Sequence, residues 1–364
     1  MTKYVCIDGT YRLTVLGYPL VVVGTQDNNH KFKLIALGLT KHEREKDFKF
    51  ILNSVQDSLQ KVFQYQWNID LLLSDSSFAI YSASKAVFGN KYTHGMCSVH
   101  FWRNVQRQIS IIVPVDRRKE LKKDLEFLKN IHETLMFDRA IDLFEQKWEE
   151  HIPEFLEYLL ATWVNSVFCN WYNGSIPPGF STTNNGIEGF NNGLKVKYTE
   201  WERLEIGEFI KVVKEIIQDY SQEGTTGLFP ISISIEEEDW KKAQITQQNS
   251  FIKLENNTFY WGHSLNKGTS CKVTQQVITK YQNINRCRSL KAFMDVYCVW
   301  KVDIGDDLTS SSCTCPRFRL YHYCKHIIAS LLKLEFMKVP EEFSIEKIVE
   351  QNNRRGRIKK AETI

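Results

Sequence analysis

The 364-residue sequence lacks several features that would place it in familiar classes of protein. It has no apolar run long enough to span a bilayer, and its N-terminus does not follow the basic, apolar, small-residue order of a signal peptide. It also lacks the composition of a disordered chain, because 43% of its residues are hydrophobic and 13% are aromatic. The sequence therefore predicts a folded, soluble, intracellular protein without a membrane partner.

The chain also lacks an excess of charge of one sign. Its 47 basic and 43 acidic side chains give a net charge of +4, and the last fourteen residues alone hold five basic side chains against one acidic one. The remainder of the chain is therefore neutral overall. Nucleic-acid binding must then come from local patches and from the basic tail rather than from a global electrostatic field.

The nine cysteines do not indicate a disulfide-stabilised secreted domain, because their number is odd and the chain is long and apolar. Four candidate zinc ligands lie within fourteen residues, namely Cys313, Cys315, Cys324 and His326. Three thiolates and one imidazole suit tetrahedral zinc. Since Cys324 and His326 are two residues apart, they cannot share one helical face, so we expect Cys324 at a helix entry and His326 in the first turn. The sequence predicts a structural zinc site.

The order of the apolar segments predicts an α/β domain. Strand-like and helix-like patterns follow one another as strand, hairpin, helix, strand, helix, strand, and this order fits a ribonuclease-H-like mixed sheet. Thr40 and Glu43 have the spacing of a capping box at the start of the first helix. The segments are, in order, 3–7, 18–39, 40–63, 69–75, 78–87 and 94–99.

Helical patterns fill about residues 115–175 and predict a helical insertion. Beyond it, a run of capping residues precedes Glu188, which places this carboxylate in the first turns of another helix. Gly186, Gly189 and Gly193 are spaced three and four residues apart on that helix. Because glycines on one face permit close backbone approach, we expect the helix to lie tight against the sheet.

Three carboxylates stand out in this arrangement: Asp8 and Asp75 at the ends of strands, and Glu188 on the later helix. Each one alone has an ordinary explanation, as a turn residue or as a solvated helix residue. Together they can share one site at neutral pH only if protons or metal ions offset their repulsion. Mg²⁺ or Mn²⁺ is the natural partner of such oxygen ligands.

Four ordered blocks of the sequence, at residues 7–11, 73–75, 96–104 and 183–191, resemble the Mutator-like element (MULE) transposases. The resemblance covers roughly residues 3–220. It implies a ribonuclease-H-like fold, a DDE metal site and a helical insertion before the glutamate. It also implies that Asp8, Asp75 and Glu188 are the catalytic ligands of Mg²⁺ or Mn²⁺ in the cleavage and strand transfer of DNA phosphodiesters.

Cys97 and His100 form a CxxH pair, which is also a feature of that family. Two ligands make half of a zinc site, and the sequence supplies no obvious second half. Three interpretations stay open. The pair binds a metal, or it consists of a buried cysteine and a histidine bonded to the backbone, or His100 contacts DNA near the site.

The cysteine cluster resembles the SWIM zinc finger, a ββα module commonly found downstream of MULE catalytic domains. Basic and aromatic side chains between its two ligand pairs suit contacts with phosphates and bases, and they suit a protein partner as well. The tail resembles an AT-hook and is typical of a nuclear-import signal, so we expect a nuclear protein. The candidate DNA-binding residues are Arg317, Arg319 and Lys325 in the finger and Arg355 and Arg357 in the tail.

These observations predict four parts. They are a DDE transposase domain at 1–222, a connecting region at 223–290, a SWIM zinc finger at 291–340 and a disordered basic tail at 341–364. The leading hypothesis is a MULE transposase-like enzyme that acts on DNA, uses zinc for structure and Mg²⁺ or Mn²⁺ for catalysis, and could form a homo-oligomer.

Two further hypotheses follow from the short N-terminus. The chain begins only seven residues before Asp8, so the upstream DNA-recognition domain of full-length relatives is expected to be missing. One alternative is therefore a domesticated, transposase-derived regulator that binds DNA without catalysis. The other is an adaptor that binds protein partners through the SWIM module.

Overall fold

The computed structural model describes residues 3–27, 31–177, 179–222, 235–249, 251–254, 257–262 and 272–343. The chain forms two compact units, Met1–Pro230 and Ile231–Ile364. Among the described residues, no helix is both long and apolar enough to cross a membrane. Of the predicted disordered tail at 341–364, residues 341–343 are described and form a 3₁₀ turn, so the prediction is wrong for these three; the remainder, with Arg355 and Arg357, lies outside the described residues.

The first unit is built on a five-stranded mixed sheet with the strand order β3-β2-β1-β4-β5. The strands are β1 (Tyr4–Thr10), β2 (Leu20–Gln26), β3 (Phe32–Leu39), β4 (Leu71–Ser74) and β5 (Thr93–Met96). β2 pairs antiparallel with β1 and β3, whereas β4 pairs parallel with β1 and β5. This sheet confirms the predicted α/β class and the hairpin next to the first strand.

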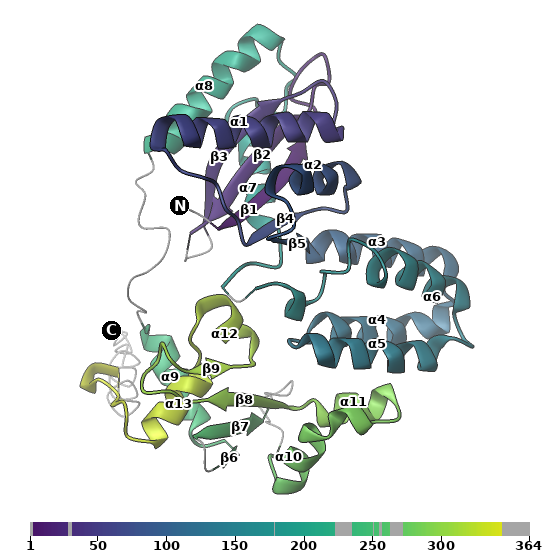
Figure 1. Ribbon diagram of the computed structural model, residues 1–364, viewed down its shortest axis with the longest axis vertical. Coiled ribbons are helices and arrows are strands. Elements are labelled where there is room, and N and C mark those ends of the chain that lie inside the picture. The colour runs from purple at the N-terminus through teal and green to yellow at the C-terminus, as the bar shows by residue number, and fades with distance from the viewer. Residues whose placement is uncertain are drawn as a thin grey trace, which may run out of the picture. The chain divides into compact units, whose positions relative to one another are not determined.

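Helices cover both faces of this sheet (Figure 1). They are α1 (Glu45–Phe63), α2 (Phe78–Phe88), α7 (Asn185–Lys197) and α8 (Ile206–Gln222). Because side chains alternate along a strand, Val5 and Ile7 of β1 pack against α1 and α2, whereas Tyr4 and Cys6 pack against α7 and α8. Asp8 continues the even-numbered series, which directs its carboxylate toward α7.

β1 is longer than the sequence pattern predicts. It continues to Thr10, so the prediction that Asp8 ends the strand is wrong. The parallel pairing with β4, however, stops at Cys6 and Leu73, and Asp75 directly follows β4. Both aspartates therefore lie beyond the last paired residues of two parallel neighbours, at the edge where open α/β sheets place ligands.

The start of α1 also differs from the expectation. Its N-cap is Arg44, whose backbone N–H donates to the Asp47 carboxylate at 3.0 Å, and the helix begins at Glu45. The capping box predicted for Thr40 and Glu43 is therefore wrong. The Glu43 carboxylate instead accepts a hydrogen bond from the Tyr11 hydroxyl.

A bundle of helices lies between β5 and α7 in the sequence. It consists of α3 (Ser98–Ile112), α4 (Val115–Lys129), α5 (Thr134–Trp148), α6 (Pro153–Leu159), a π-helical turn (Leu160–Val164) and a 3₁₀ turn (Asn173–Ser175). The Phe101 ring stacks on Trp171 with centroids 4.0 Å apart, within its aromatic core. The chain then returns to the sheet, where the Met96 N–H donates to the Asn170 carbonyl at 2.9 Å.

The close approach predicted for three glycines of α7 occurs at one of them. A Cβ atom on Gly186 would lie 3.1 Å from Nε2 of Gln26 and 3.3 Å from Cβ of Phe32. A Cβ atom on Gly189 or Gly193 would meet no atom within 4 Å, so the prediction is wrong for these two. Among the three glycines, only Gly186, next to Glu188, lies at a close approach of the helix to the sheet, and the rest of the helix packs through larger side chains such as Phe190 and Leu194.

The second unit contains a four-stranded antiparallel sheet in the order β6-β7-β8-β9. Strands β8 (Val299–Asp303) and β9 (Ser312–Cys313), followed by helix α13 (Lys325–Lys333), supply the ββα order expected of the finger. The short helix α12 (Pro316–Tyr321) lies between β9 and α13 in the sequence. The elements of the second unit are α9 (Glu237–Thr246), β6 (Phe251–Lys253), β7 (Thr258–Gly262), α10 (Gln275–Gln282), α11 (Leu290–Val296), β8 (Val299–Asp303), β9 (Ser312–Cys313), α12 (Pro316–Tyr321) and α13 (Lys325–Lys333). Trp240 of α9 and Trp261 of β7 pack into the same core as the cysteine ligands.

Candidate functional sites

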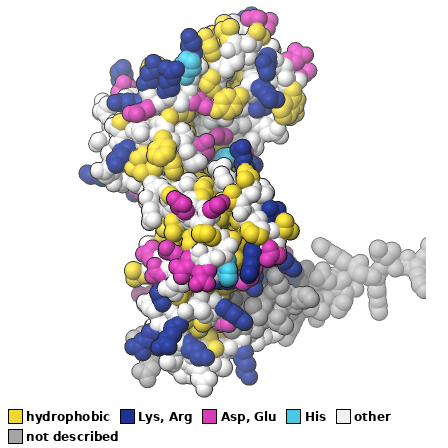
Figure 2. Space-filling model, turned by 90° about the vertical axis from the view of Figure 1, so that its right-hand side faces the viewer, with side chains coloured by type: hydrophobic (Ala, Val, Ile, Leu, Met, Phe, Trp, Pro, Cys, Tyr) yellow, Lys and Arg dark blue, Asp and Glu magenta, His cyan; other side chains and the backbone are white. Residues whose placement is uncertain are grey.

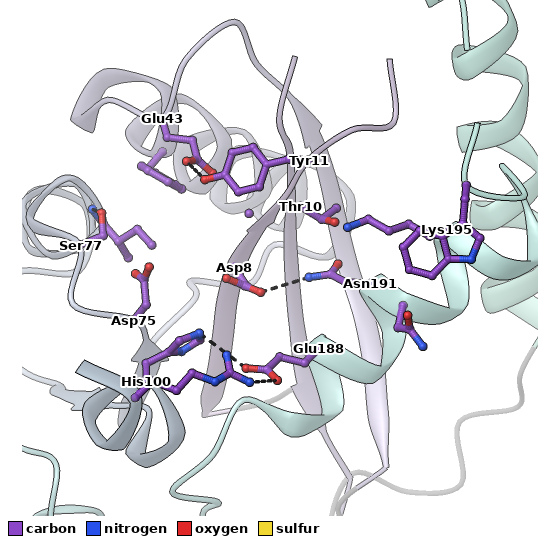
Figure 3. A pocket seen from close by; sticks show the side chains of 16 residues that line it. Asp8, Thr10, Tyr11, Glu43, Asp75, Ser77, His100, Glu188, Asn191 and Lys195 are labelled. Atoms are coloured by element: carbon purple, nitrogen blue, oxygen red, sulfur yellow. Dashed lines mark hydrogen bonds and ion pairs between the residues drawn. The ribbon is translucent and has the colours of Figure 1, made fainter. Parts of the chain in front are cut away.

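Asp8, Asp75 and Glu188 line one cavity of the first unit, which we call the carboxylate pocket (Figure 3). The cavity has a volume of about 380 Å³. β1 supplies Asp8, the end of β4 supplies Asp75 and the first turn of α7 supplies Glu188. The other polar residues that line the pocket are Thr10, Tyr11, Glu43, Ser77, His100, Arg103, Asn191, Asn192 and Lys195.

The two aspartates are held in an environment that disfavours their negative charges. Burial raises the pKa of Asp8 to about 6, and the nearby charge of Asp75 acts in the same direction. Burial also raises the pKa of Asp75, although His100 opposes this effect. Asn191 Nδ2 donates to Asp8 Oδ2 at 3.1 Å, which orients that carboxylate without neutralising it. The pocket is therefore suited to take up a proton or a cation.

Glu188 is contacted by two basic side chains from α3. Its Oε1 lies 3.5 Å from Nε2 of His100, and its Oε2 lies 3.5 Å from a terminal guanidinium nitrogen of Arg103. The second of these cations, Arg103, belongs to a block singled out in the sequence but was not predicted as a site residue. The two contacts aim the carboxylate into the pocket.

The Cys97–His100 pair links α3 to this pocket. Interaction with Cys97 raises the pKa of His100 against the effect of burial, and the charges of Asp8 and Asp75 add to the rise. Burial alone would raise the pKa of Cys97, but interactions with His100 and the hydrogen bond from the Asn184 N–H together outweigh it, so the pKa is lowered. Within the described part of the chain, no further residue completes a metal cluster with this pair.

The oxygen atoms of the carboxylate pocket fit a hard divalent cation. Asp75 Oδ1 and Asn191 Oδ1 are buried and make no hydrogen bond, and Glu188 Oε1 makes none beyond its 3.5 Å contact with His100. Buried acceptors without partners are costly, and carboxylate and amide oxygens are the ligands that Mg²⁺ and Mn²⁺ prefer. Among the described residues, the three carboxylates are not gathered into a cluster as tight as that of the four cysteine and histidine ligands, whose ligand atoms lie within 4.8 Å of one another.

Sequence reasoning missed Glu43 and Tyr11 as pocket residues. The spacing of Glu43 from Thr40 had suggested a helix cap, and burial raises the pKa of Glu43 in the pocket. Gly9 makes room for this side chain, because a Cβ atom there would collide with the Glu43 carboxylate. The Asp8–Gly9 dipeptide could have suggested such a close approach.

The four predicted zinc ligands meet in the second unit, where we call them the thiolate cluster. Cys313 ends β9, Cys315 is the N-cap of α12, Cys324 is the N-cap of α13, and His326 lies in the first turn of α13. Their candidate ligand atoms all lie within 4.8 Å of one another, and all four residues are buried. This confirms the grouping predicted from spacing, and the donor set fits zinc.

The surroundings hold the thiolate cluster in place. Burial raises the pKa of Cys313 and of Cys324 well above the usual thiol range. Trp261 Nε1 donates to Ser330 Oγ at 2.9 Å, and the Ser330 hydroxyl donates to the His326 carbonyl at 2.8 Å. These bonds tie the ligand-bearing turn of α13 to β7.

Arg317, one of the predicted DNA contacts, has partners within the second unit. A terminal guanidinium nitrogen donates to both carboxylate oxygens of Asp239 at 3.1 Å. The Tyr323 hydroxyl donates to the same carboxylate at 2.8 Å. Arg319 lies on α12, and Lys325 begins α13. These positions place the basic residues around the thiolate cluster, and DNA contact stays a prediction.

Two protein families match the chain. Residues 4–104 match the MULE transposase domain, and residues 300–335 match the SWIM zinc finger. The first match includes Asp8 and Asp75, and the second includes all four residues of the thiolate cluster. No curated protein matches the sequence.

Proposed function

Because the chain carries a MULE transposase domain followed by a SWIM zinc finger, we propose that it cleaves and joins DNA phosphodiesters by a DDE-type, metal-dependent reaction. The observation that carries this proposal is the meeting of Asp8, Asp75 and Glu188 in one pocket. The strand order of the five-stranded sheet, with helices on both faces, supports a ribonuclease-H-like fold for the first unit.

The three carboxylates would hold Mg²⁺ or Mn²⁺. Divalent cations at such a site supply an activated nucleophile and stabilise the leaving oxygen of a phosphodiester. Asn191 orients Asp8, while His100 and Arg103 orient Glu188. The Arg103 guanidinium, and His100 when it is protonated, also offset part of the negative charge that a bound phosphodiester brings into the pocket.

Cleavage and joining are the same exchange of bonds. In cleavage, water attacks phosphorus, one P–O bond forms, and the P–O bond to the leaving strand breaks, so one end keeps the phosphate and the other becomes a hydroxyl. In strand transfer, a DNA hydroxyl takes the place of water. The chain therefore needs to position the nucleophile and the leaving group in line and to stabilise the charge on the phosphoryl oxygens.

The SWIM finger is proposed as the structural zinc module, with DNA as the partner of the chain. The 47 basic and 43 acidic side chains of the chain nearly balance, which favours local contacts over a global electrostatic field. Figure 2 shows that side chains of both signs lie on the drawn face. The basic residues around the thiolate cluster, including Arg319 and Lys325, are the candidates for such contacts. The basic sequence at 354–360 supports a nuclear location as a further part of the proposal.

Calorimetry with Mn²⁺ tests the proposal directly. Mn²⁺ is titrated into the zinc-loaded full chain, into Asp8→Asn and into Asp70→Asn. Asp70 is a matched control because it precedes β4, at the opposite end from Asp75, and forms an exposed ion pair with Lys3 at 3.3 Å.

Wild type and Asp70→Asn should bind Mn²⁺ saturably, whereas Asp8→Asn should bind at least about 10-fold more weakly because a charged ligand is removed. Nicking of supercoiled DNA in Mn²⁺ should follow the same order. Absence of saturable binding in the folded wild type would overturn the catalytic proposal and favour the DNA-binding regulator.

A further inference from the structure

A second cavity, which we call the side cavity, adjoins the carboxylate pocket. It has a volume of about 330 Å³ and is lined by Tyr11, Arg12, Lys195 and Trp201. Tyr11, Lys195 and Trp201 also line the carboxylate pocket, so the two spaces share a wall. Figure 3 shows Tyr11 and Lys195 at the edge of the pocket.

The side cavity shares three of its four lining residues with its neighbour but none of the neighbour's carboxylates. It combines two aromatic rings with two cations, and it includes no carboxylate. Both rings are accessible, since Trp201 is 64% exposed and Tyr11 is 50% exposed. The ammonium nitrogen of Lys195 lies 6.0 Å from the centre of the Trp201 ring. A flat ring with cations around it suits a ligand that is both planar and anionic.

The backbone around the side cavity is held in an unusual conformation. Arg12, Glu200 and Trp201 have φ values of +64°, +48° and +67°, in the left-handed region that non-glycine residues seldom adopt. The two loops that carry these residues are joined, because the Leu204 N–H donates to the Leu13 carbonyl at 3.0 Å. Strain of this kind persists only where the surroundings enforce it, and it is often found at ligand sites.

We propose that the side cavity binds a nucleotide that flanks the scissile phosphodiester. Its base stacks on Trp201, and its phosphate lies near Lys195 and Arg12. The inference rests on the proposed function, since it places the scissile phosphate of the same strand in the carboxylate pocket. Stacking requires a base that has left the duplex, so the ligand is an unpaired or splayed nucleotide.

Charge and continuity favour a nucleic acid strand over a protein segment as the occupant. The carboxylate pocket repels anions until cations are bound, whereas the side cavity attracts them through Arg12 and Lys195. A strand that runs from one cavity into the other would meet a metal site and a basic, aromatic site in succession. A single strand carries both the phosphates that suit the metal site and the bases that suit the aromatic site.

Photochemical cross-linking tests the inference without the need for catalysis. A single-stranded oligonucleotide with one 5-iododeoxyuridine is irradiated with the zinc-loaded full chain, and the linked residue is mapped by mass spectrometry. We expect the link at Trp201 or Tyr11. Asp8→Asn should keep the link, because this variant affects the carboxylate pocket alone.

Substitutions of Trp201 provide the second readout. Trp201→Ala should lose the link and bind the oligonucleotide about 10-fold more weakly. Trp201→Phe should keep most of the cross-linking and most of the affinity, because it retains an aromatic ring. Phe63→Ala is the control, since Phe63 is a similarly exposed aromatic residue at the end of α1 that lines neither cavity. A link that maps elsewhere, with unchanged binding by Trp201→Ala, would overturn the inference.

The two proposals can fail separately. A link at Trp201 in a protein that does not bind Mn²⁺ would overturn the catalytic proposal and support a nucleotide site. Saturable Mn²⁺ binding with no link at Trp201 or Tyr11 would overturn the inference and support the metal site.

Discussion

The carboxylate pocket and the thiolate cluster are both suited to metal ions, but they gather their ligands differently. The cluster draws four ligands from residues 313–326 and holds the ligand atoms within 4.8 Å of one another. The pocket draws its carboxylates from β1, β4 and α7, and they do not come as close together. The carboxylates of the pocket repel one another unless a proton or cation is present, and this repulsion opposes the close grouping seen in the cluster.

This difference predicts that the two sites affect the stability of their units in different ways. Zinc binding to the thiolate cluster also stabilises the fold of the second unit, because the ligands lie in its core. The carboxylate pocket instead reduces the stability of the first unit when no cation is bound, since burial raises the pKa of both Asp8 and Asp75 and the charge of Asp75 adds to the rise at Asp8.

Removal of a zinc ligand should have the largest effect on stability. Cys324→Ser should abolish stoichiometric zinc binding and unfold the second unit, because structural zinc contributes on the order of 10 kcal/mol to so small a unit. Zinc analysis and hydrogen exchange read out separately for each unit would measure this. Cys287→Ser, which leaves the four ligands intact, is the control. Native-like protection of the second unit in Cys324→Ser would contradict the prediction.

Neutralising Asp8 should change the stability by an intermediate amount, and it should stabilise the protein rather than destabilise it. A carboxyl group whose pKa is raised from 3.8 to about 6 in the folded state lowers stability as the pH rises through this range, and the loss persists at higher pH. Asp8→Asn should therefore stabilise the first unit by about 2–3 kcal/mol at neutral pH without added Mn²⁺, because each pKa unit corresponds to about 1.4 kcal/mol.

Urea unfolding of the zinc-loaded protein at several pH values would measure the gain from Asp8→Asn. The gain should shrink toward zero near the ordinary carboxyl pKa, and saturating Mn²⁺ should reduce it at neutral pH. Asp70→Asn should show neither trend, because its ion pair with Lys3 is exposed. A gain that is independent of pH would contradict the electrostatic explanation.

A methyl group added at Gly9 should have the smallest effect on stability. Gly9→Ala should cost about 1 kcal/mol, because the new methyl group displaces only the flexible end of Glu43. In the Glu43→Ala background, Gly9→Ala should reduce the stability by less, since the colliding carboxylate is gone. A double-mutant cycle by urea unfolding would measure this coupling, and equal costs in both backgrounds would show that Glu43 is not the obstacle.

Parts of both sites could be predicted from the sequence. The order of the sequence blocks singled out Asp8, Asp75 and Glu188, and the structure brings all three to one pocket. The sequence did not reveal Trp201, because a single aromatic residue after a helix forms no pattern, and its role depends on the neighbouring loop at Tyr11 and Arg12. Glu43 was assigned to a helix cap because local spacing cannot show a partner as distant as Tyr11.

By itself the sequence determined the composition of the thiolate cluster, because its four ligands lie in one short stretch whose turns bring them together. The periodicity of the apolar segments also determined the α/β class, since strand and helix patterns depend on local spacing. Tertiary structure alone decided how the carboxylate pocket is built and what adjoins it. The pairing of β1 with β4 and the burial of α7 against the sheet join residues far apart in the chain, and such contacts depend on the packing of the whole first unit.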